Sequence, residues 1–324
     1  MDRLNICWGL VGAGNVTEVK SGPGLYKNPN SVLEGVYNRT KERAIKFAYQ
    51  HGVPKVFDTL EDLLADEYID IVYIATPPHT HHPFAMKCLE AGKAVYIEKP
   101  LTLTYAEALE IDTKAKEKGL PTYAAFYRRA LPKFIGIKNI LDSGQIGAIR
   151  MVRITHWAKA TEQEKKGEIT WRLQKEFSGG GKFWDLAVHS LDILEFYFGK
   201  MTSFEGSVAN MGGYYDVDDT VSATFRYENG VLGCGSWCFV SDKDVEEIVI
   251  IGEKGSLRFS VFGKEGVILE KNGEFELFHY KMPNHIAMPY QASIVRELLD
   301  IEKSNANWEQ ALDLMKWIDK LYNK

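Results

Sequence analysis

The 324-residue sequence predicts an α/β protein of two domains. Residues 1–125 are expected to form a doubly wound parallel sheet, and residues 126–324 an α+β domain with a large, open, mostly antiparallel sheet. Three observations predict this class. The chain is too long for one ordinary core and long enough for two. Its first 125 or so residues alternate short apolar runs with segments of helical spacing. After about residue 130, strand-like runs lie in pairs, one on each side of a group of turn residues.

The N-terminal pattern is that of strands buried on both faces, each followed by a helix. Thr104 and Glu107 form a capping-box start for one of these helices, and Gly119 stops it. Strand, helix and strand repeated in this way predict a parallel sheet with helices on both faces. The expected strands are Ile6 to Val11, Val32 to Tyr37, Ile71 to Ala75, Ala94 to Ile97 and Thr122 to Phe126, and the expected helices are Thr40 to His51, Thr59 to Asp66, Pro83 to Ala91 and Thr104 to Lys118.

The C-terminal pattern favours hairpins. Asn229-Gly230 and Asn272-Gly273 each lie between two strand-like runs, where Asn-Gly is a strong hairpin signal. A third turn lies at Lys254-Gly255, and a closing helix is expected from about Trp308 with Asn307 as its cap. The expected strands are Ile149 to Trp157, Val221 to Tyr227, Val231 to Phe239, Glu246 to Ile251, Ser256 to Val261, Val267 to Glu270 and Glu274 to Tyr280.

Composition excludes several classes of function. The net charge of −5 argues against a nucleic-acid partner, since such proteins usually carry a strongly basic face. No apolar stretch approaches a membrane span, and the N-terminus lacks a signal-peptide layout. The four scattered cysteines fit buried apolar residues better than disulfides or half of a zinc site. We therefore expect a cytoplasmic protein without a metal, a membrane partner or a nucleic-acid partner.

A glycine-rich turn follows the first expected strand. Gly12 and Gly14 allow a tight turn and a close approach of a pyrophosphate to the backbone. The helix start at Asn15 and Val16 would supply N–H donors and a partial positive charge. The third position of the pattern, usually Gly or Ala, is Thr17. The alternative is a tight turn without a ligand, but its place at the first strand–helix turn favours a dinucleotide site.

Asn38 and Arg39 follow the second expected strand, where sites specific for NAD place a carboxylate for the adenosine ribose. This chain lacks the carboxylate that would repel a 2′-phosphate and has a cation, Arg39, beside that position. This pattern favours NADP, with NAD as the alternative. The alternative for Arg39 is a solvent-exposed side chain at the start of a helix that binds no ligand.

Two further segments carry chemistry. Glu98-Lys99-Pro100 follows the strand ending at Ile97, and ligands of open α/β sheets bind beyond the carboxyl ends of strands. After Gly179–Gly181, residues Asp185, His189 and Asp192 are spaced to share one helix face. Such a stripe is costly to bury unless its members are paired or functional. A capping role for Asp185 and a structural role for His189 are the alternatives.

These motifs resemble those of the glucose–fructose oxidoreductase, inositol dehydrogenase and rhizopine-catabolism (Gfo/Idh/MocA) family. The resemblance covers essentially the whole chain. It rests on Gly12-Ala13-Gly14, Ala75 to His82, Glu98-Lys99-Pro100 and Gly179 to Asp192. It implies a Rossmann domain followed by an open, mostly antiparallel sheet.

By this resemblance, Lys99, Asp185 and His189 match catalytic positions, and the loop with Thr76, Pro77 and His79 contacts the cofactor. A carbinol that loses hydride must also lose its hydroxyl proton. His189 is the favoured acid or base, Asp185 orients it, and Lys99 stabilises the reacting oxygen or relays the proton itself. The expected cofactor contacts are Gly12, Gly14, Asn15, Val16, Asn38, Arg39, Thr76, Pro77, His79, Glu98 and Lys99.

Arg129, Trp157, Trp171 and Arg172 are the remaining candidates for substrate contacts, together with Asp185 and His189. Arginines and tryptophans suit a polyhydroxylated ring, although packing between domains would also explain each one singly. The resemblance implies NAD(P)-dependent hydride transfer to or from a sugar, inositol or related polyol. It also implies a homodimer or homotetramer through the C-terminal sheet. The alternative is a non-catalytic dinucleotide sensor of the same fold.

Overall fold

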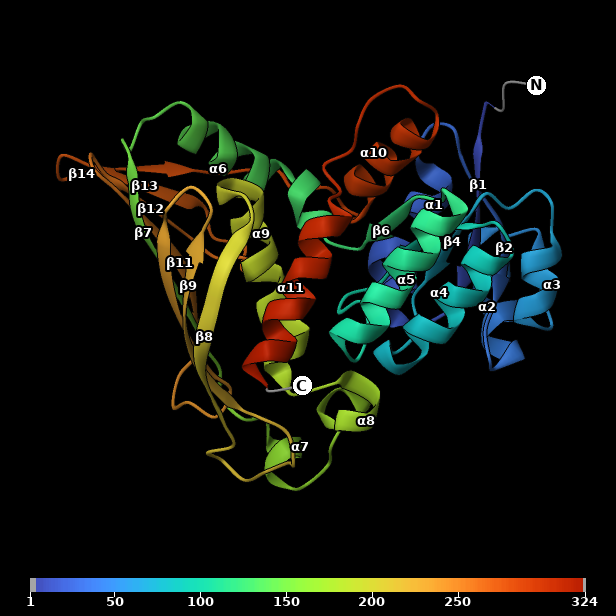
Figure 1. Ribbon diagram of the computed structural model, residues 1–324, viewed down its shortest axis with the longest axis horizontal. Helices are drawn as coiled ribbons and strands as arrows, with labels where there is room; N and C mark the ends of the chain where they lie inside the picture. Colours follow the sequence, from blue (N-terminus) through green and yellow to red (C-terminus); the bar gives the residue numbers. More distant parts are fainter. Residues whose placement is uncertain (1–3, 323–324) are drawn as a thin grey trace. The chain divides into compact units, whose positions relative to one another are not determined.

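The computed structural model describes residues 4–322 and divides into two compact units. The first contains the chain up to Leu131 together with Pro283–Trp308, and the second contains Pro132–Met282 and the chain from Glu309. Each unit is built around its own sheet (Figure 1). No helix within residues 4–322 is both long enough and apolar enough to cross a membrane.

The first unit contains a six-stranded parallel sheet in the order β3-β2-β1-β4-β5-β6. This is the doubly wound order, in which the strand sequence reverses between β1 and β4. The predicted parallel sheet is confirmed, and the short strand β3 is an addition to it. The strands are β1 (Ile6–Val11), β2 (Ser31–Tyr37), β3 (Lys55–Val56), β4 (Ile71–Ile74), β5 (Ala94–Ile97) and β6 (Thr122–Ala124).

Helices cover both faces of this sheet because its crossovers run in opposite directions from the centre. One face carries α1 and α2, and the other carries α4 and α5 (Figure 1). The helical segments are η1 (Thr17–Ser21, a π-helical turn), α1 (Gly24–Lys27), α2 (Lys41–His51), α3 (Leu60–Ala65), η2 (Pro78–Thr80), α4 (His81–Glu90), α5 (Tyr105–Lys118), η3 (Tyr127–Ala130) and α10 (Met288–Leu298).

The start and end signals of α5 act as the sequence indicates. The Thr104 side chain accepts a hydrogen bond from the backbone N–H of Glu107, and Gly119 ends the helix in the left-handed conformation with φ of 64°. The Glu107 carboxylate accepts from the N–H of Leu103 at 3.0 Å, one residue before the cap.

Helix α10 packs against the first sheet, although the expected boundary assigned all of residues 126–324 to the second domain. The Tyr290 hydroxyl donates to the carbonyl of Ala124 in β6 at 2.8 Å, and the Gln291 amide donates to the carbonyl of Ser21 at 2.9 Å. Both side chains are buried. Helix α10 thereby covers apolar sheet surface beside α1, and local sequence patterns do not reveal such a return of the chain.

The second unit contains an eight-stranded sheet in the order β14-β13-β12-β11-β7-β10-β9-β8. Its neighbouring strands are antiparallel except β7 and β10, so the predicted open, mostly antiparallel sheet is confirmed. The predicted hairpin turns have positive φ at Gly230, Asn272 and Gly273. The strands are β7 (Ile149–Trp157), β8 (Met201–Ala209), β9 (Thr220–Tyr227), β10 (Leu232–Cys238), β11 (Val245–Gly252), β12 (Ser256–Phe259), β13 (Val267–Lys271) and β14 (Glu274–Phe278).

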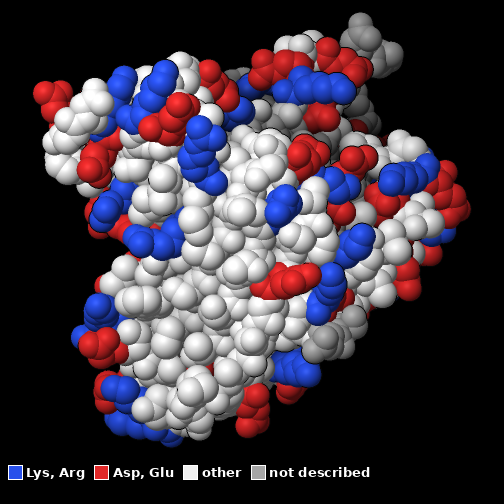
Figure 2. Space-filling view, turned by 60° about the vertical axis from the view of Figure 1, so that its left-hand side comes forward, with Lys and Arg blue, Asp and Glu red and all other residues white. Residues whose placement is uncertain are grey.

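The helices of this unit lie on one face of its sheet, and no helix of residues 132–322 covers the other face (Figure 1). Figure 2 brings this uncovered face forward and shows that its central part carries few charged side chains. On the same face of the sheet, Glu247 forms ion pairs with Arg153 and Arg258. The helical segments are α6 (Pro132–Asp142), α7 (Glu162–Lys165), η4 (Trp171–Leu173), α8 (Lys175–Ser178), η5 (Phe183–Ala187, a π-helical turn), α9 (Val188–Phe198) and α11 (Trp308–Leu321).

Candidate functional site

The glycine turn after β1 fits a bound dinucleotide. Gly12 has φ of 103°, and a Cβ on it would lie 2.8 Å from the carbonyl oxygen of Ala75, so the position requires glycine. A Cβ on Gly14 would meet no heavy atom within 4 Å. The space over Gly14 is therefore open to a ligand, as a pyrophosphate approaching the backbone requires.

Thr17 occupies the third position of the pattern without disrupting the turn. Its side chain is buried, and its hydroxyl donates to the carbonyl of Gly14 at 2.8 Å. The N–H groups of Thr17 and Glu18 donate to the same carbonyl at 3.1 Å. The helix beginning at Asn15 continues from Thr17 to Ser21 as a π-helical turn, so these bonds tie the helix start to the turn.

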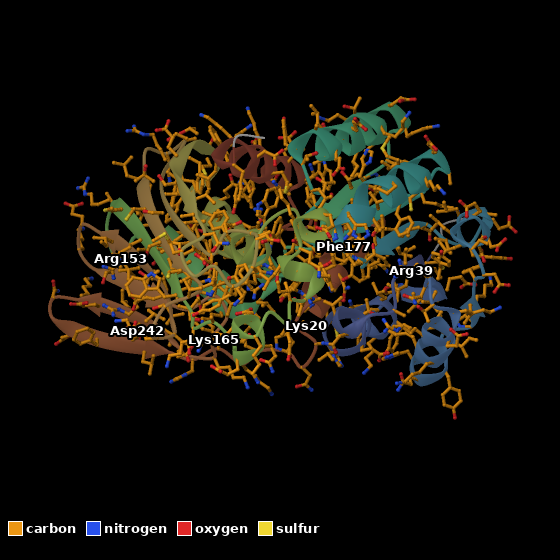
Figure 3. The ribbon with its side chains drawn as sticks, turned by 90° about the horizontal axis from the view of Figure 1, so that it is seen from below. Lys20, Arg39, Arg153, Lys165, Phe177 and Asp242 are labelled. Atoms are coloured by element: carbon orange, nitrogen blue, oxygen red, sulfur yellow. The ribbon has the colours of Figure 1, made fainter. Side chains whose placement is uncertain are left out.

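Asn38 connects the ends of β1 and β2. Its Oδ1 accepts from the N–H of Ala13 at 3.1 Å, and its Nδ2 donates to the carbonyl of Thr40 at 2.9 Å. The neutral amide therefore satisfies a donor on one side and an acceptor on the other, which a carboxylate does not do. Arg39, labelled in Figure 3, is exposed on the same turn.

The loop after β4 is fixed by a histidine that the sequence analysis did not single out. His81 is fully buried, with Nε2 2.8 Å from the carbonyl of Thr76 and Nδ1 3.0 Å from that of Pro100. Burial lowers the pKa of His81 to about 4, although the carbonyls favour its charged form. The ring packs between the loop after β4 and the turn after β5, and in its neutral form it has one N–H to donate to their carbonyls. Pro77 and His79 are half-buried in this loop.

Glu98 and Lys99 are half-buried at the end of β5. Glu98 Oε1 accepts from the hydroxyl of Tyr73 at 2.5 Å, and the Lys99–Pro100 peptide bond is cis. The turns after β1, β2, β4 and β5 all leave the same edge of the parallel sheet. The first unit therefore brings together at one edge the segments named for the cofactor and for Lys99, as the sequence predicts.

In the second unit, the glycine segment before η5 is enclosed by neighbouring groups. A Cβ on Gly180 would lie 1.7 Å from the Trp184 ring, and one on Gly181 would lie 2.0 Å from the carbonyl oxygen of Asp218. The Gly181 N–H donates to the Asp218 carboxylate at 2.9 Å. These glycines therefore allow close packing beneath the start of a helix.

Asp185 lies near two of the residues expected at the substrate. It belongs to η5, and the Arg172 guanidinium lies 3.7 Å from its carboxylate. That guanidinium stacks over the ring of Trp171 at 4.4 Å. The structure thus gathers a carboxylate, a cation and a flat aromatic face within this unit. A π-helical turn is uncommon and occurs frequently at functional sites.

His189 lies in the first turn of α9 and is 5% exposed. The ring of Phe262 meets it edge-on at a centroid distance of 5.7 Å and also lies 5.4 Å from the ring of His156. Glu246 holds this loop, since its carboxylate accepts from the N–H of Phe262 at 3.0 Å. Phe262 escaped the sequence analysis because a lone aromatic residue in a turn gives no signal before folding.

Trp157 and Arg129 have other surroundings within their own units. Trp157 is on the uncovered face of the second sheet, where its indole N–H donates to Ser236 at 3.1 Å. Its neighbour His156 points to the opposite, helix-covered face, as strand alternation requires. Arg129 belongs to the first unit, where it is 2% exposed in η3.

Comparison with known proteins identifies the family. A sequence model described as an oxidoreductase family with an NAD-binding Rossmann fold matches residues 6–126, and that of the GFO/IDH/MocA C-terminal domain matches residues 134–258. The chain belongs to the Gfo/Idh/MocA family. This Gfo/Idh/MocA protein is therefore an oxidoreductase with a nicotinamide-nucleotide-binding Rossmann unit, as the sequence motifs indicated.

Several relatives align over nearly the whole Gfo/Idh/MocA chain. Oxidoreductase P35 of Formosa agariphila is 38% identical over 95% of both chains. Trans-1,2-dihydrobenzene-1,2-diol dehydrogenase of Mus musculus is 30% identical over 90% of this chain and 87% of its own. The structure of a levoglucosan dehydrogenase in complex with NADH and levoglucosan has a TM-score of 0.84 at 20% identity, covering 98% of this chain and 96% of its own. That likeness shows the shared fold.

Proposed function

We propose that this protein transfers hydride between NADP and the carbinol or carbonyl carbon of a sugar, an inositol or a related polyol. The observation that carries the proposal is the position of Lys99. It follows β5 at the sheet edge that also holds the glycine turn of β1 and the Thr76 loop of β4. A cation is thereby placed in the cofactor-binding unit, at the edge where nucleotides bind in such sheets.

The residues of this edge fit a nicotinamide dinucleotide. Open space over Gly14 suits the pyrophosphate, and Asn15 and Val16 begin the helix beside it. Thr76, Pro77, His79 and Glu98 are the residues proposed to hold the remaining parts of the cofactor. When bound, the nicotinamide supplies or accepts the hydride. The protein has to bind the substrate, position it and move the hydroxyl proton.

Three side chains are proposed for that work. Lys99 donates a hydrogen bond to the reacting oxygen and stabilises its negative charge. His189 removes or returns the hydroxyl proton, because an imidazole is suited to both directions near neutral pH. Asp185 lies one turn before His189 and orients the substrate or the imidazole. Phe262 restricts the His189 ring by its edge-on contact.

The group around Asp185 supports a polyhydroxylated substrate. Arg172 offers several N–H donors, and the Trp171 ring beneath it offers an apolar face. A sugar or dihydrodiol ring presents hydroxyl groups at its rim and C–H bonds on its faces, which matches this pair. The names of the relatives, a dihydrodiol dehydrogenase and a levoglucosan dehydrogenase, agree with this substrate class.

The preference for NADP is supported by Asn38 and Arg39. No carboxylate at the end of β2 repels a 2′-phosphate, and the exposed Arg39 guanidinium is available to bind one. We also propose that the uncovered face of the second sheet pairs with a second copy of the chain. Met151, Leu232 and Ile251 expose apolar side chains on that face, and light scattering measures the oligomeric state directly.

The test begins with titrations of NADPH and NADH into purified protein, followed by the fluorescence of the reduced nicotinamide. A panel of inositols, hexoses, anhydrosugars and dihydrodiols then identifies the substrate. Lys99→Ala should lower kcat by about 10²- to 10⁴-fold with the cofactor Kd largely kept. Lys46→Ala, an exposed lysine on α2, is the control.

Unchanged turnover in Lys99→Ala would overturn the assignment of Lys99. Binding of cofactor without turnover of any panel member would instead indicate the sensor of the same fold. Binding of neither NADPH nor NADH would remove the basis of the proposal.

A further inference from the structure

A buried hydrogen-bonded chain runs beneath the cofactor edge of the first sheet. Tyr73, in the middle of β4, is fully buried, and its hydroxyl lies between two partners. Glu98 Oε1, at the end of β5, is 2.5 Å away, and Ser21 Oγ, in η1, is 2.8 Å away. One phenol thus contacts both the helix that follows the glycine turn and the carboxylate that precedes Lys99.

The direction of these bonds follows from the groups. An ionised carboxylate only accepts hydrogen bonds, so the Tyr73 O–H donates to Glu98. The Ser21 oxygen is the other contact of the phenol, at 2.8 Å, and the Ser21 hydroxyl itself donates to the carbonyl of Val16 at 3.2 Å. Burial, and next the charge of Glu98, raise the pKa of Tyr73 well above its usual value, so the phenol stays protonated and remains a donor.

The far end of the chain is anchored as well. The Ser21 carbonyl accepts from the Gln291 amide of α10 at 2.9 Å, and the Gln291 side chain is fully buried. Helix α10 therefore holds η1 in place, and η1 in turn holds the Tyr73 hydroxyl. A charge-assisted hydrogen bond at a buried carboxylate is among the stronger ones in proteins, so it fixes the direction of the Glu98 side chain.

We propose that Tyr73 is a positioning residue that fixes the Glu98 carboxylate for the cofactor and couples it to the turn that binds the pyrophosphate. The inference rests on the proposed function, since Glu98 requires a fixed direction only if it binds the cofactor. A carboxylate held in one direction presents its second oxygen, which also accepts from the backbone N–H of Lys99 at 3.3 Å, to a donor on the ligand such as a ribose hydroxyl. A freely rotating carboxylate has to be ordered at the moment of binding, which weakens affinity.

Tyr96 provides a matched control. It lies beside Tyr73 on the neighbouring strand, is equally buried, and its ring centroid is 4.7 Å from that of Tyr73. Within residues 4–322 its hydroxyl has no hydrogen-bond partner. Tyr96→Phe therefore removes a buried hydroxyl from the same core without removing a bond to Glu98.

The experiment measures the Kd of NADPH by nicotinamide fluorescence and the free energy of unfolding by urea. Tyr73→Phe should raise the Kd about tenfold, the usual effect of losing a hydrogen bond to a charged group, whereas Tyr96→Phe should change it less than about twofold. Glu98→Ala should raise the Kd at least as much as Tyr73→Phe. In the Glu98→Ala background, Tyr73→Phe should have no further effect on the Kd, because its partner is already gone.

Ser21→Ala is a second variant, for the case that Tyr73→Phe folds poorly. It keeps the bond between Tyr73 and Glu98 and removes the Ser21 hydroxyl, with its contact to Tyr73 and its bond to the Val16 carbonyl, so the Kd should rise by about two- to fivefold. Equal Kd values for Tyr73→Phe and Tyr96→Phe would overturn the inference, as would a full effect of Tyr73→Phe in the Glu98→Ala background. If the Tyr73 variants contradict the inference in one of these two ways while Lys99→Ala abolishes turnover, the proposed function stands and only the role of Tyr73 fails.

Discussion

Alanine substitutions at the two glycines of the β1 turn should have opposite consequences. A Cβ at Gly14 meets no heavy atom within 4 Å, and the φ of Gly14 lies outside the left-handed region. Gly14→Ala should therefore leave the fold intact and even stabilise it by about 0.4–1 kcal/mol, because the unfolded chain loses entropy. A Cβ at Gly12 lies 2.8 Å from the Ala75 carbonyl oxygen at φ of 103°. Gly12→Ala should cost about 1–3 kcal/mol of stability or more.

For Gly14→Ala, the expected effect on cofactor binding is opposite to the expected effect on stability. The added methyl group occupies the space that a pyrophosphate needs in order to reach the backbone N–H groups. We expect the Kd of NADPH to rise at least about tenfold, equivalent to roughly 1.4 kcal/mol. The assay pairs nicotinamide fluorescence titration with urea unfolding followed by circular dichroism, so that affinity and stability are measured on the same preparations.

A Gly14→Ala variant that is stable and binds NADPH as tightly as the unsubstituted protein would refute the reasoning. It would mean that the cofactor does not pass over this turn. A variant that loses affinity and stability together would also contradict the argument, because the open space around Gly14 predicts a loss of affinity alone. Gly12→Ala serves as the contrast, since its loss of stability should precede any loss of binding.

Two further predictions concern neighbouring residues of the same edge. Burial lowers the pKa of His81 to about 4 from 6.5, so between these pH values the unfolded chain binds the extra proton. The stability from this group is therefore present near neutral pH and falls as the pH is lowered toward 4, so urea unfolding of His81→Gln should show a shallower pH dependence. Asn38→Asp places an oxygen 2.9 Å from the Thr40 carbonyl and a negative charge beside Arg39. It should raise the ratio of the Kd for NADPH to that for NADH at least about tenfold, measured by titration.

The first of these has a matched comparison, and each has an outcome that would contradict it. His82→Gln changes a neighbouring, more exposed histidine that pairs with Glu110, and its urea unfolding is measured over the same pH range. An identical pH dependence for His81→Gln would show that His81 titrates as it does in the unfolded chain. An unchanged Kd ratio in Asn38→Asp would remove the end of β2 as the determinant of cofactor choice.

The sequence predicted most of the fold because its signals are local. Strands β1, β5 and β7 begin and end at the expected residues, since the apolar runs of β1 and β5 are bounded by polar or turn residues and β7 has the side-chain alternation of a strand. The hairpins around Gly230 and Gly273 follow from turns that require positive φ. Helix α10 was not predicted as part of the first unit, because its apolar face gives no indication of which sheet it covers.

For the site, the sequence determined which segments carry the chemistry, and the tertiary structure decided which side chains meet. Parallel strands send their carboxyl ends to one edge, so Gly12, Asn38, Thr76 and Lys99 were expected to gather there from topology alone. The contact of Phe262 with His189 depends on packing between elements distant in sequence, as does the bond of Tyr73 to Glu98. The alternation of side chains along a strand is a local property, but only the helices that pack on a sheet determine which of the sheet's two faces is buried.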